Sequence, residues 1–413
     1  MTTGTLRTDG AATVPAGRPR GTARLVLLAS IVVSFLASSS APTPLYAVYA
    51  DAWHFSPITT TVVFGVYAIA VLLALLVLGR VSDHVGRRPV LLTALALQIA
   101  AMAVFATAGG TAELFVGRVL QGVATGGALG ALGAAMLDVD RARGTLANAA
   151  APGMGTGLGA LASGVIVQFL PAPTHLVYLL LIAVFAAQAA GVALMPETVG
   201  RAPGLRASLV PELAVPRRLR GPVLAAAPAL FAVWALAGFY GALAPAVARQ
   251  LSGSTSEVTG GLGLFVLAFT ASLVTVALNR AAPRTVMLLG IALLVAGSLG
   301  TWASTEASST AGFFLCAVVS GVGFGAGFQG GIRTVVPLAA PHERAGVLSV
   351  LYVVCYFGMG VPAVAAGVLV VHGGGGLTGV TRDYCLFVTA LALSALTALL
   401  RTRPPEPVAP AGR

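Results

Sequence analysis

Ionisable side chains are rare in this chain, yet five of them fall between positions 80 and 88: Arg80, Asp83, His84, Arg87 and Arg88. Residues 59–78 and 90–108, on either side, are almost wholly apolar, and each run is about the ~20 residues that a helix needs to cross a bilayer. The pattern predicts two membrane-spanning helices joined by a charged turn. Asp83 lies four residues before Arg87, close enough to pair within a compact turn.

The turn resembles the signature G-x-L-x-D-x-x-G-R-R/K, which joins the second and third helices of the major facilitator superfamily. Val81 stands where leucine is usual, and the residues that match are Gly79, Asp83, Gly86, Arg87 and Arg88. The resemblance implies a conformational switch, in which Asp83 approaches the start of the eleventh span near Arg344 in only one state. The alternative is an arginine-rich loop that merely sets topology.

Arg118 is a charged residue inside an apolar run, at residues 113–136. An arginine at this depth costs about +2.5 to +3.5 kcal/mol on insertion scales, so it is expected to face a polar interior. Together with Gln121 and Gly122 it resembles the superfamily signature R-x-x-Q-G, which implies a role for Arg118 and Gln121 in coupling or substrate binding. The alternative is a structural arginine hydrogen-bonded to neighbouring helix carbonyls.

Four alternate glycines follow Pro152 in the next apolar run: Gly153, Gly155, Gly157 and Gly159. Glycines four residues apart let two helices approach closely. The run resembles the glycine-rich antiporter signature of exporters in this superfamily. That signature has a Gly-Pro pair before its further glycines, whereas Pro152 here comes first. Plain helix packing is the alternative explanation.

A proton-driven transporter needs a carboxylate that titrates in its pathway. No acid falls at the centre of an apolar run, and the candidates are Asp51 and Glu113 at outer helix ends, expected near Arg118. The alternative for each is a solvated helix end.

Polar and aromatic residues within the spans are candidates to line a substrate cavity, and aromatic rings with few charges suit a large apolar or weakly cationic ligand. Each of them is also explained by packing or by anchoring at the membrane interface. The candidates are Tyr46, Tyr67, Trp234, Tyr240, Gln329, Tyr352 and Tyr356. We expect no cofactor, and no residues are spaced as metal ligands.

Composition places the chain among polytopic membrane proteins. Apolar residues make up 57% of it, charged residues 9%, and the mean hydropathy is +0.93. The net charge of +11 comes from arginines scattered between apolar runs. A nucleic-acid partner is therefore not expected. Membrane lipids and a small molecule are the expected partners.

The apolar runs predict twelve spans and an all-α fold. A cleaved secretory signal at residues 25–41 is the alternative for the first span, in which Pro42 and Pro44 are expected to form a kink. The later spans are expected at residues 59–78, 90–108, 113–136, 145–170, 174–195, 222–248, 258–279, 285–304, 311–334, 345–371 and 384–400. We predict an N-terminal tail (1–24), a six-helix half (25–195), a linker (196–221), a second six-helix half (222–400) and a C-terminal tail (401–413).

Arginine distribution predicts the orientation. If the N-terminus is cytoplasmic, inner segments hold 21 of the 24 arginines and outer loops hold only Arg249 and Arg382. We expect a multi-pass protein of the cell membrane with both termini in the cytoplasm, working as a monomer.

Taken with the resemblance, these features predict a twelve-helix transporter with two pseudo-symmetric halves that rock about a midplane site. The resemblance is strongest to drug or metabolite exporters of the proton antiporter type, which implies protons as a partner. The first alternative is a solute:proton symporter that imports a sugar or organic acid. A membrane-embedded enzyme would need clustered catalytic groups, which the sequence lacks, and a sensor would not need the switch signature.

Overall fold

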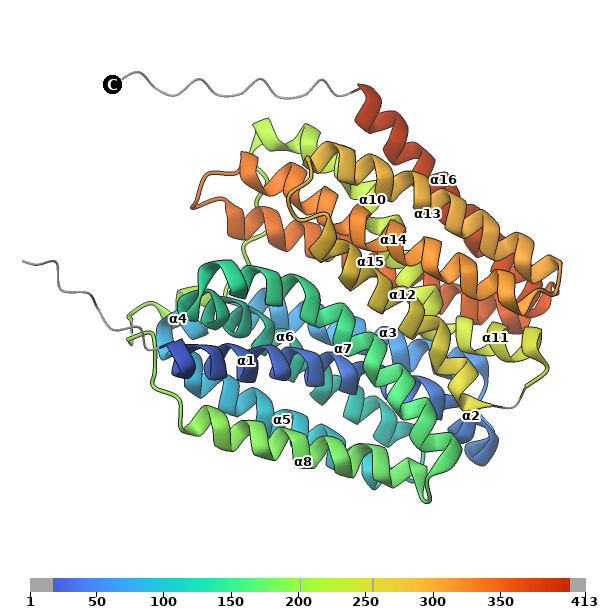
Figure 1. Cartoon of the computed structure of the whole chain (residues 1–413), viewed down its shortest axis with the longest axis horizontal. Helices are drawn as coiled ribbons and strands as arrows, with labels where there is room; N and C mark the ends of the chain where they lie inside the picture. Colours follow the sequence, from blue (N-terminus) through green and yellow to red (C-terminus); the bar gives the residue numbers. More distant parts are fainter. Residues whose placement is uncertain (1–17, 201, 255, 402–413) are drawn as a thin grey trace, which may run out of the picture.

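The computed structural model describes residues 18–200, 202–254 and 256–401, and within them all regular structure is helical (Figure 1). Twelve segments in these ranges are long and apolar enough to cross a membrane. Leucines such as Leu73, Leu180 and Leu315 are exposed on the outer faces of these helices, as hydrocarbon surroundings require. Positions 1–17 and 402–413 of the predicted tails lie outside the described residues.

The helices before the linker form one group, with short connections between them. Their bounds are α1 (Arg18–Ser40), α2 (Pro42–Trp53), α3 (Pro57–Leu78), α4 (Ser82–Val85), α5 (Arg87–Ala106), α6 (Thr111–Val139), α7 (Arg141–Phe169) and α8 (Pro173–Ala193). Phe35 and Phe185 meet edge to face in the core of this group, with ring centroids 5.5 Å apart.

A second group follows the linker, which itself carries two short helical turns. The bounds are α9 (Leu205–Ser208) and η1 (Arg217–Leu219) in the linker, then α10 (Arg220–Ala242), α11 (Ala244–Ser252), α12 (Glu257–Ala277), α13 (Pro283–Glu306), α14 (Thr310–Val335), η2 (Val336–Leu338), α15 (Arg344–His372) and α16 (Gly376–Arg401). Phe239 and Tyr384, with centroids 5.4 Å apart, lie in its core. In Figure 1 this group occupies the upper part of the view and α1–α8 the lower part.

Two spans are broken near one end by proline. The predicted kink in the first span is a helix break, because α1 ends at Ser40 and α2 begins at Pro42. The span predicted as continuous over residues 222–248 is likewise broken at Leu243, and this prediction was wrong. Proline lacks the N–H that would continue the preceding helix, so it is best placed in a new first turn.

Two other boundaries differ from the predictions. α1 begins at Arg18, inside the range predicted as a tail, and α16 begins at Gly376 rather than at residue 384. Arg382 and Asp383, predicted in or next to a loop, therefore lie within α16. A hydropathy profile does not detect these additional turns of helix, because a helix can extend beyond the hydrocarbon layer, where its polar side chains reach water.

The two groups touch along α7 with α12 and along α3 with α15. A Cβ atom on Gly261 of α12 would overlap the carbonyl oxygen of Ala160 on α7, and one on Gly65 of α3 would lie 2.9 Å from Val364 Cγ2 on α15. We call the end of the bundle that holds the α3–α5 turn and the linker the linker end. We call the other end, where α2 and α11 lie, the opposite end (Figure 1). Gly261 is in the second turn of α12, just after α11, and Gly65 is in the first half of α3, just after α2.

Equivalent glycines pack equivalent helix pairs in the two groups. A Cβ on Gly126 of α6 would overlap the carbonyl oxygen of Val71 on α3, and one on Gly325 of α14 would overlap that of Ala271 on α12. Both pairs are offset by about 200 residues, so the same close helix contact occurs twice. This repeat in three dimensions is what two pseudo-symmetric six-helix units require.

Candidate functional site

The charged turn between α3 and α5 is a compact unit organised around Arg87. The predicted pair between Asp83 and Arg87 is confirmed, and Arg87 Nη1 also donates to Ser82 Oγ at 2.6 Å. Arg87 Nε lies 3.6 Å from Asp138 at the end of α6. Gly86 adopts φ +103°, a value that side chains disfavour, which explains glycine at this position. The turn thus ties α3, α5 and α6 together.

A carboxylate from the linker caps this turn, and the sequence analysis did not identify it. Glu197 accepts hydrogen bonds from the backbone N–H groups of Arg87 (2.9 Å) and Arg88 (3.0 Å), the first two residues of α5. Partial burial raises the pKa of the Glu197 carboxyl, but the hydrogen bonds from Arg87, Val199, Arg88 and Thr198 outweigh it and hold the pKa below its usual value. A Cβ at Gly86 would collide with this carboxyl group.

The linker makes further contacts at this end of the bundle. On the α3–α5 turn, Ala202 N donates to the carbonyl oxygen of His84 at 3.0 Å, and Arg80 pairs with Glu212. On the second group, Arg218 pairs with Glu343, just before α15. The linker is therefore docked on both halves, and it joins the signature turn to the start of α15.

The expected contact of Asp83 with the start of α15 is not present in this conformation. Within the described residues, no hydrogen bond or ion pair joins Asp83 to α15. Glu343 occupies this helix end instead: its carboxylate accepts from Ala340 N at 2.9 Å, and this bond together with Arg218 keeps the pKa of Glu343 below its usual value. Arg344 donates to the Ala339 carbonyl oxygen. The contact expected in a second state stays a prediction.

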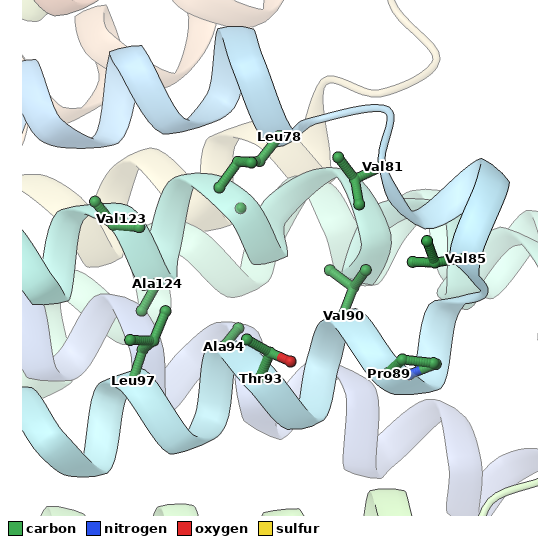
Figure 2. A pocket seen from close by; sticks show the side chains of 11 residues that line it. Leu78, Val81, Val85, Pro89, Val90, Thr93, Ala94, Leu97, Val123 and Ala124 are labelled. Carbon is green, nitrogen blue, oxygen red and sulfur yellow. The ribbon is translucent and has the colours of Figure 1, made fainter. Parts of the chain in front are cut away.

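An apolar cavity of about 220 Å³ lies directly behind the turn (Figure 2). Val81 and Val85 of the turn face it, together with Val90 on α5 and Val123 on α6, and Thr93 is the polar residue that Figure 2 shows at its wall. Residues of the turn, of α5 and of α6 thus share one apolar wall.

Arg118 is completely buried within the first group and bonded to α1 and α2. Its Nε and Nη2 donate to Tyr46 Oη at 2.9 and 2.5 Å, and its Nη1 donates to the Ser39 carbonyl oxygen and to Gln121 Oε1, both at 2.7 Å. Gln121 Nε2 donates in turn to the Ser38 carbonyl oxygen at 2.9 Å. These bonds reach the last turn of α1 just before the break, where carbonyl groups lose their helical partners.

The partners of Arg118 are all neutral. Three aromatic rings surround the guanidinium, with its carbon 5.3 Å from the Tyr67 ring centroid, 5.5 Å from Tyr46 and 5.9 Å from Phe105. Among the described residues, no carboxylate lies within salt-bridge distance of Arg118. The cluster therefore carries an uncompensated positive charge inside the bundle.

Tyr67 connects this cluster to the second group. It belongs to an apolar cluster with Tyr356, and Tyr352 and Trp234 pack against that cluster. The Trp234 ring lies 4.9 Å from Tyr356, and its Nε1 is buried without an acceptor among the described residues. Aromatic residues thus extend from α3 through α15 to α10, across the contact between the halves.

Two of the other cavity candidates lie elsewhere. Tyr240 is fully buried in the core of the second group, where its hydroxyl is 3.3 Å from Thr301 Oγ1, so its placement on a cavity was wrong. It was proposed as an aromatic residue inside a span, but its hydroxyl points towards Thr301 on α13. Gln329 donates to the Thr275 carbonyl oxygen on α12 at 3.0 Å and so links two helices of one half.

The acids proposed as proton sites lie at the opposite end and are exposed. Asp51 is in the last turn of α2 and Glu113 in the first turn of α6, and neither bonds to Arg118. Glu257, at the start of α12, pairs with Arg249 at 2.9 Å. The backbone N–H of Glu257 also donates across the halves, to the Gln168 side-chain oxygen at 3.1 Å. Within the described ranges, no His, Cys, Asp and Glu side chains form a group that could hold a metal.

The alternate glycines of α7 serve two different contacts. Gly155 and Gly159 face α1, where a Cβ would overlap the carbonyl oxygens of Val33 and Ala37. Gly153 and Gly157 face α12 in the other half, and a Cβ at Gly157 would lie 3.2 Å from the Phe265 carbonyl oxygen. One run of glycines therefore lets α7 pack closely on its own half and on its partner half.

Two six-helix units, glycine-lined contacts between them and a buried arginine cluster define a polytopic membrane protein of the transporter type. The family model of the Major Facilitator Superfamily matches residues 27–275, more than half of the chain. The chain belongs to the major facilitator superfamily.

The fold is shared with a solved transporter. The crystal structure of the nucleoside transporter NupG, in a mutant form, is similar with a TM-score of 0.71 and 14% sequence identity, over 92% of this chain and 99% of that one. No curated protein sequence matches the chain. At this identity the likeness shows the fold alone.

Proposed function

We propose that the chain is a secondary active transporter that carries a small, largely apolar solute by rocking its two halves. The observation that carries the proposal is the arrangement of contacts between the halves. Close glycine contacts lie at the opposite end, where a Cβ on Gly164 would come within 2.8 Å of the Glu257 carbonyl oxygen, while Asp83 is free of α15 at the linker end. These features support a conformation open towards the linker end, with a reverse conformation in which Asp83 reaches α15.

The proposed orientation places the linker end in the cytoplasm of the cell, with the protein in the cell membrane. The arginines of the signature turn, the α6–α7 turn and the linker all lie at this end, as the positive-inside rule requires of short cytoplasmic segments. In this orientation the conformation described here faces inward, and a substrate of an exporter would enter from the cytoplasm.

Our first proposal for the transport mode is export in exchange for protons. The partial glycine signature of α7 supports it, because that pattern resembles the exporters of this superfamily. Asp51 and Glu113, and with them Glu257, are the acids at the opposite end placed to meet external protons, since the described spans hold no acid beside Arg118. Import of a solute is the second candidate, and the similarity to a nucleoside transporter makes nucleosides the first solutes to test for it.

Efflux of preloaded fluorescent dyes from cells that express the chain would test the first proposal. Asp83→Asn should abolish efflux, whereas Asp383→Asn should retain it. The two carboxylates have similar exposure, 54% and 58%, and both pair with an arginine, but Asp383 lies at the opposite end. Efflux should also stop with a protonophore. Efflux that persists in a well-expressed Asp83→Asn protein contradicts the rocking mechanism, and uptake of a labelled nucleoside in place of efflux favours the importer.

A further inference from the structure

The aromatic residues that join the halves form a single surface, which we call the interface cluster: Tyr67, Trp234, Phe324, Phe328, Tyr352 and Tyr356. Trp234 lies at its centre, with ring centroids 4.9 Å from Tyr356 and 5.6 Å from Phe328. Trp234, Phe328 and Tyr352 are partly exposed, so this surface is not sealed in a core. Stacking and edge contacts between rings suit a planar aromatic ligand.

The charge behind this surface is positive. Arg118 packs on Tyr67 at 5.3 Å, and it is the one charged residue among the buried side chains of the described ranges. Four of its five N–H groups have neutral acceptors and none has a carboxylate. Aromatic rings alone would attract cations, but here the guanidinium already occupies a face of Tyr67, and its unneutralised charge repels a second cation in a medium of low dielectric constant.

One buried donor of the cluster, the indole N–H of Trp234, lacks a partner among the described residues. An indole N–H can only donate, and a buried donor without an acceptor is unfavourable. A ligand at this surface would therefore gain most by presenting an acceptor, such as a carboxylate or carbonyl oxygen.

We infer that the interface cluster binds planar aromatic solutes that are neutral or anionic and carry an acceptor for Trp234, and that it discriminates against organic cations. The inference rests on the proposed function, because only a transporter would bring its solute to this surface. It replaces the weakly cationic ligand expected from the sequence with a neutral or anionic one. Arg118 influences the ligand through its positive charge, from behind Tyr67, whereas Trp234 contacts the ligand directly.

Three probes of one shape and different charge test the inference by binding alone. They are 4-nitrobenzoate, 4-nitrobenzamide and 4-nitrobenzylammonium, whose nitro group quenches tryptophan fluorescence. The purified full chain carries Trp53→Phe and Trp302→Phe, which leave Trp234 as its single tryptophan. We expect saturable quenching by the anion and the amide, with the cation at least tenfold weaker. Equal or tighter binding of the cation, or no saturable quenching by any probe, overturns the inference.

Two variants assign the effect to the residues named. In Arg118→Gln the preference for the anion over the cation should fall at least fivefold, in a protein shown to be folded by its melting curve. In Trp234→Phe, measured by equilibrium dialysis, binding of both acceptor probes should weaken about fivefold. An unchanged charge preference in folded Arg118→Gln overturns the role of Arg118.

Transport of the same probes in proteoliposomes separates this inference from the proposed function. Binding in the expected order without transport of any probe or dye contradicts the proposed function and leaves the inference standing. Transport of cations, with no binding of the anion, contradicts the inference and leaves the transporter standing.

Discussion

Glu197 of the linker accepts a hydrogen bond from the backbone N–H of Arg87 at 2.9 Å, across 110 positions of sequence. The same carboxylate accepts from Arg88 N, so it caps α5, the helix that starts at the end of the signature turn. A carboxylate at a helix N-terminus satisfies donors that have no partner within the helix and interacts favourably with the helix dipole. The linker is therefore docked on the signature turn through this carboxylate.

Removal of this cap should destabilise the turn. Glu197→Ala is expected to lower the free energy of unfolding by about 1 kcal/mol, the usual cost of losing a capping side chain. The measurement is thermal unfolding of the purified protein in detergent, with Glu306→Ala, an acid at the end of α13 and far from the linker, as control. An unchanged melting temperature for Glu197→Ala would show that the cap does not hold the turn.

The cap should also make the stability of the protein fall at acid pH. Because the pKa of Glu197 is lowered in the folded protein, its contribution to stability is fully present above the unfolded pKa, about 4.3, and is lost as the pH falls through the folded pKa. The stability difference between wild type and Glu197→Ala should therefore shrink from pH 6 to pH 3. A difference that grows on acidification would contradict the assignment.

The contact between α7 and α12 should respond to one added methyl group. Gly261→Ala places a Cβ against the Ala160 carbonyl oxygen, and overpacking of this kind costs about 1–3 kcal/mol. Because the strain lies between the halves, the variant should favour the conformation in which the opposite end is open, and labelling of a cysteine introduced at that end should accelerate. Gly379→Ala is the matched control, since a Cβ there meets nothing within 4 Å. Equal labelling rates in both variants would argue against this contact as a gate.

Gly159→Ala tests the other face of the glycine run. Its Cβ would overlap the Ala37 carbonyl oxygen on α1, within one half. We expect a lower melting temperature without faster labelling at the opposite end, because this strain is present in every state of rocking halves. Faster labelling would show that α1 and α7 also move apart during the cycle.

The Arg118 cluster should depend on one phenolic oxygen. Tyr46→Phe removes the acceptor of two guanidinium N–H groups and leaves a charged group under-bonded, at a cost of about 1–3 kcal/mol or more. Tyr240→Phe, an equally buried tyrosine with the neutral partner Thr301, should cost about 1 kcal/mol. Melting curves of the two variants measure the difference. A larger loss in Tyr240→Phe would contradict the view that Tyr46 is needed to hold a buried charge.

The features that the sequence predicted well are those with a high physical cost. A charged turn between apolar runs and a buried arginine are rarely tolerated without a role, so the signature turn and the polar surroundings of Arg118 could be predicted. Apolar runs of about 20 residues likewise predicted the twelve spans and the all-α fold. These inferences needed local sequence only.

The features that could not be predicted from the sequence depend on contacts between distant segments of the chain. In the sequence, Glu197 is an acid in a loop, and only the folded chain shows its contact with α5. The sequence places Tyr240 inside a span but does not show which way its side chain faces, which only the structure reveals. Asp51 and Glu113 were expected near Arg118, but their side chains are exposed at helix ends, whereas the Arg118 side chain is buried and bonds to α1 and α2. The second helix break, next to Pro245, would have needed the comparison of Pro245 with Pro44, near which a kink was predicted.

Distances measured across both ends of the bundle test the central claim, that the halves alternate. Spin-label pairs at positions 142 and 277 for the linker end, and 52 and 250 for the opposite end, join the two halves at exposed sites. The labels require prior replacement of Cys316, Cys355 and Cys385. In lipid nanodiscs each pair should show two distances, and Asp83→Asn should change their populations in opposite senses at the two ends. A single distance at both ends, unmoved by Asp83→Asn, would contradict alternation.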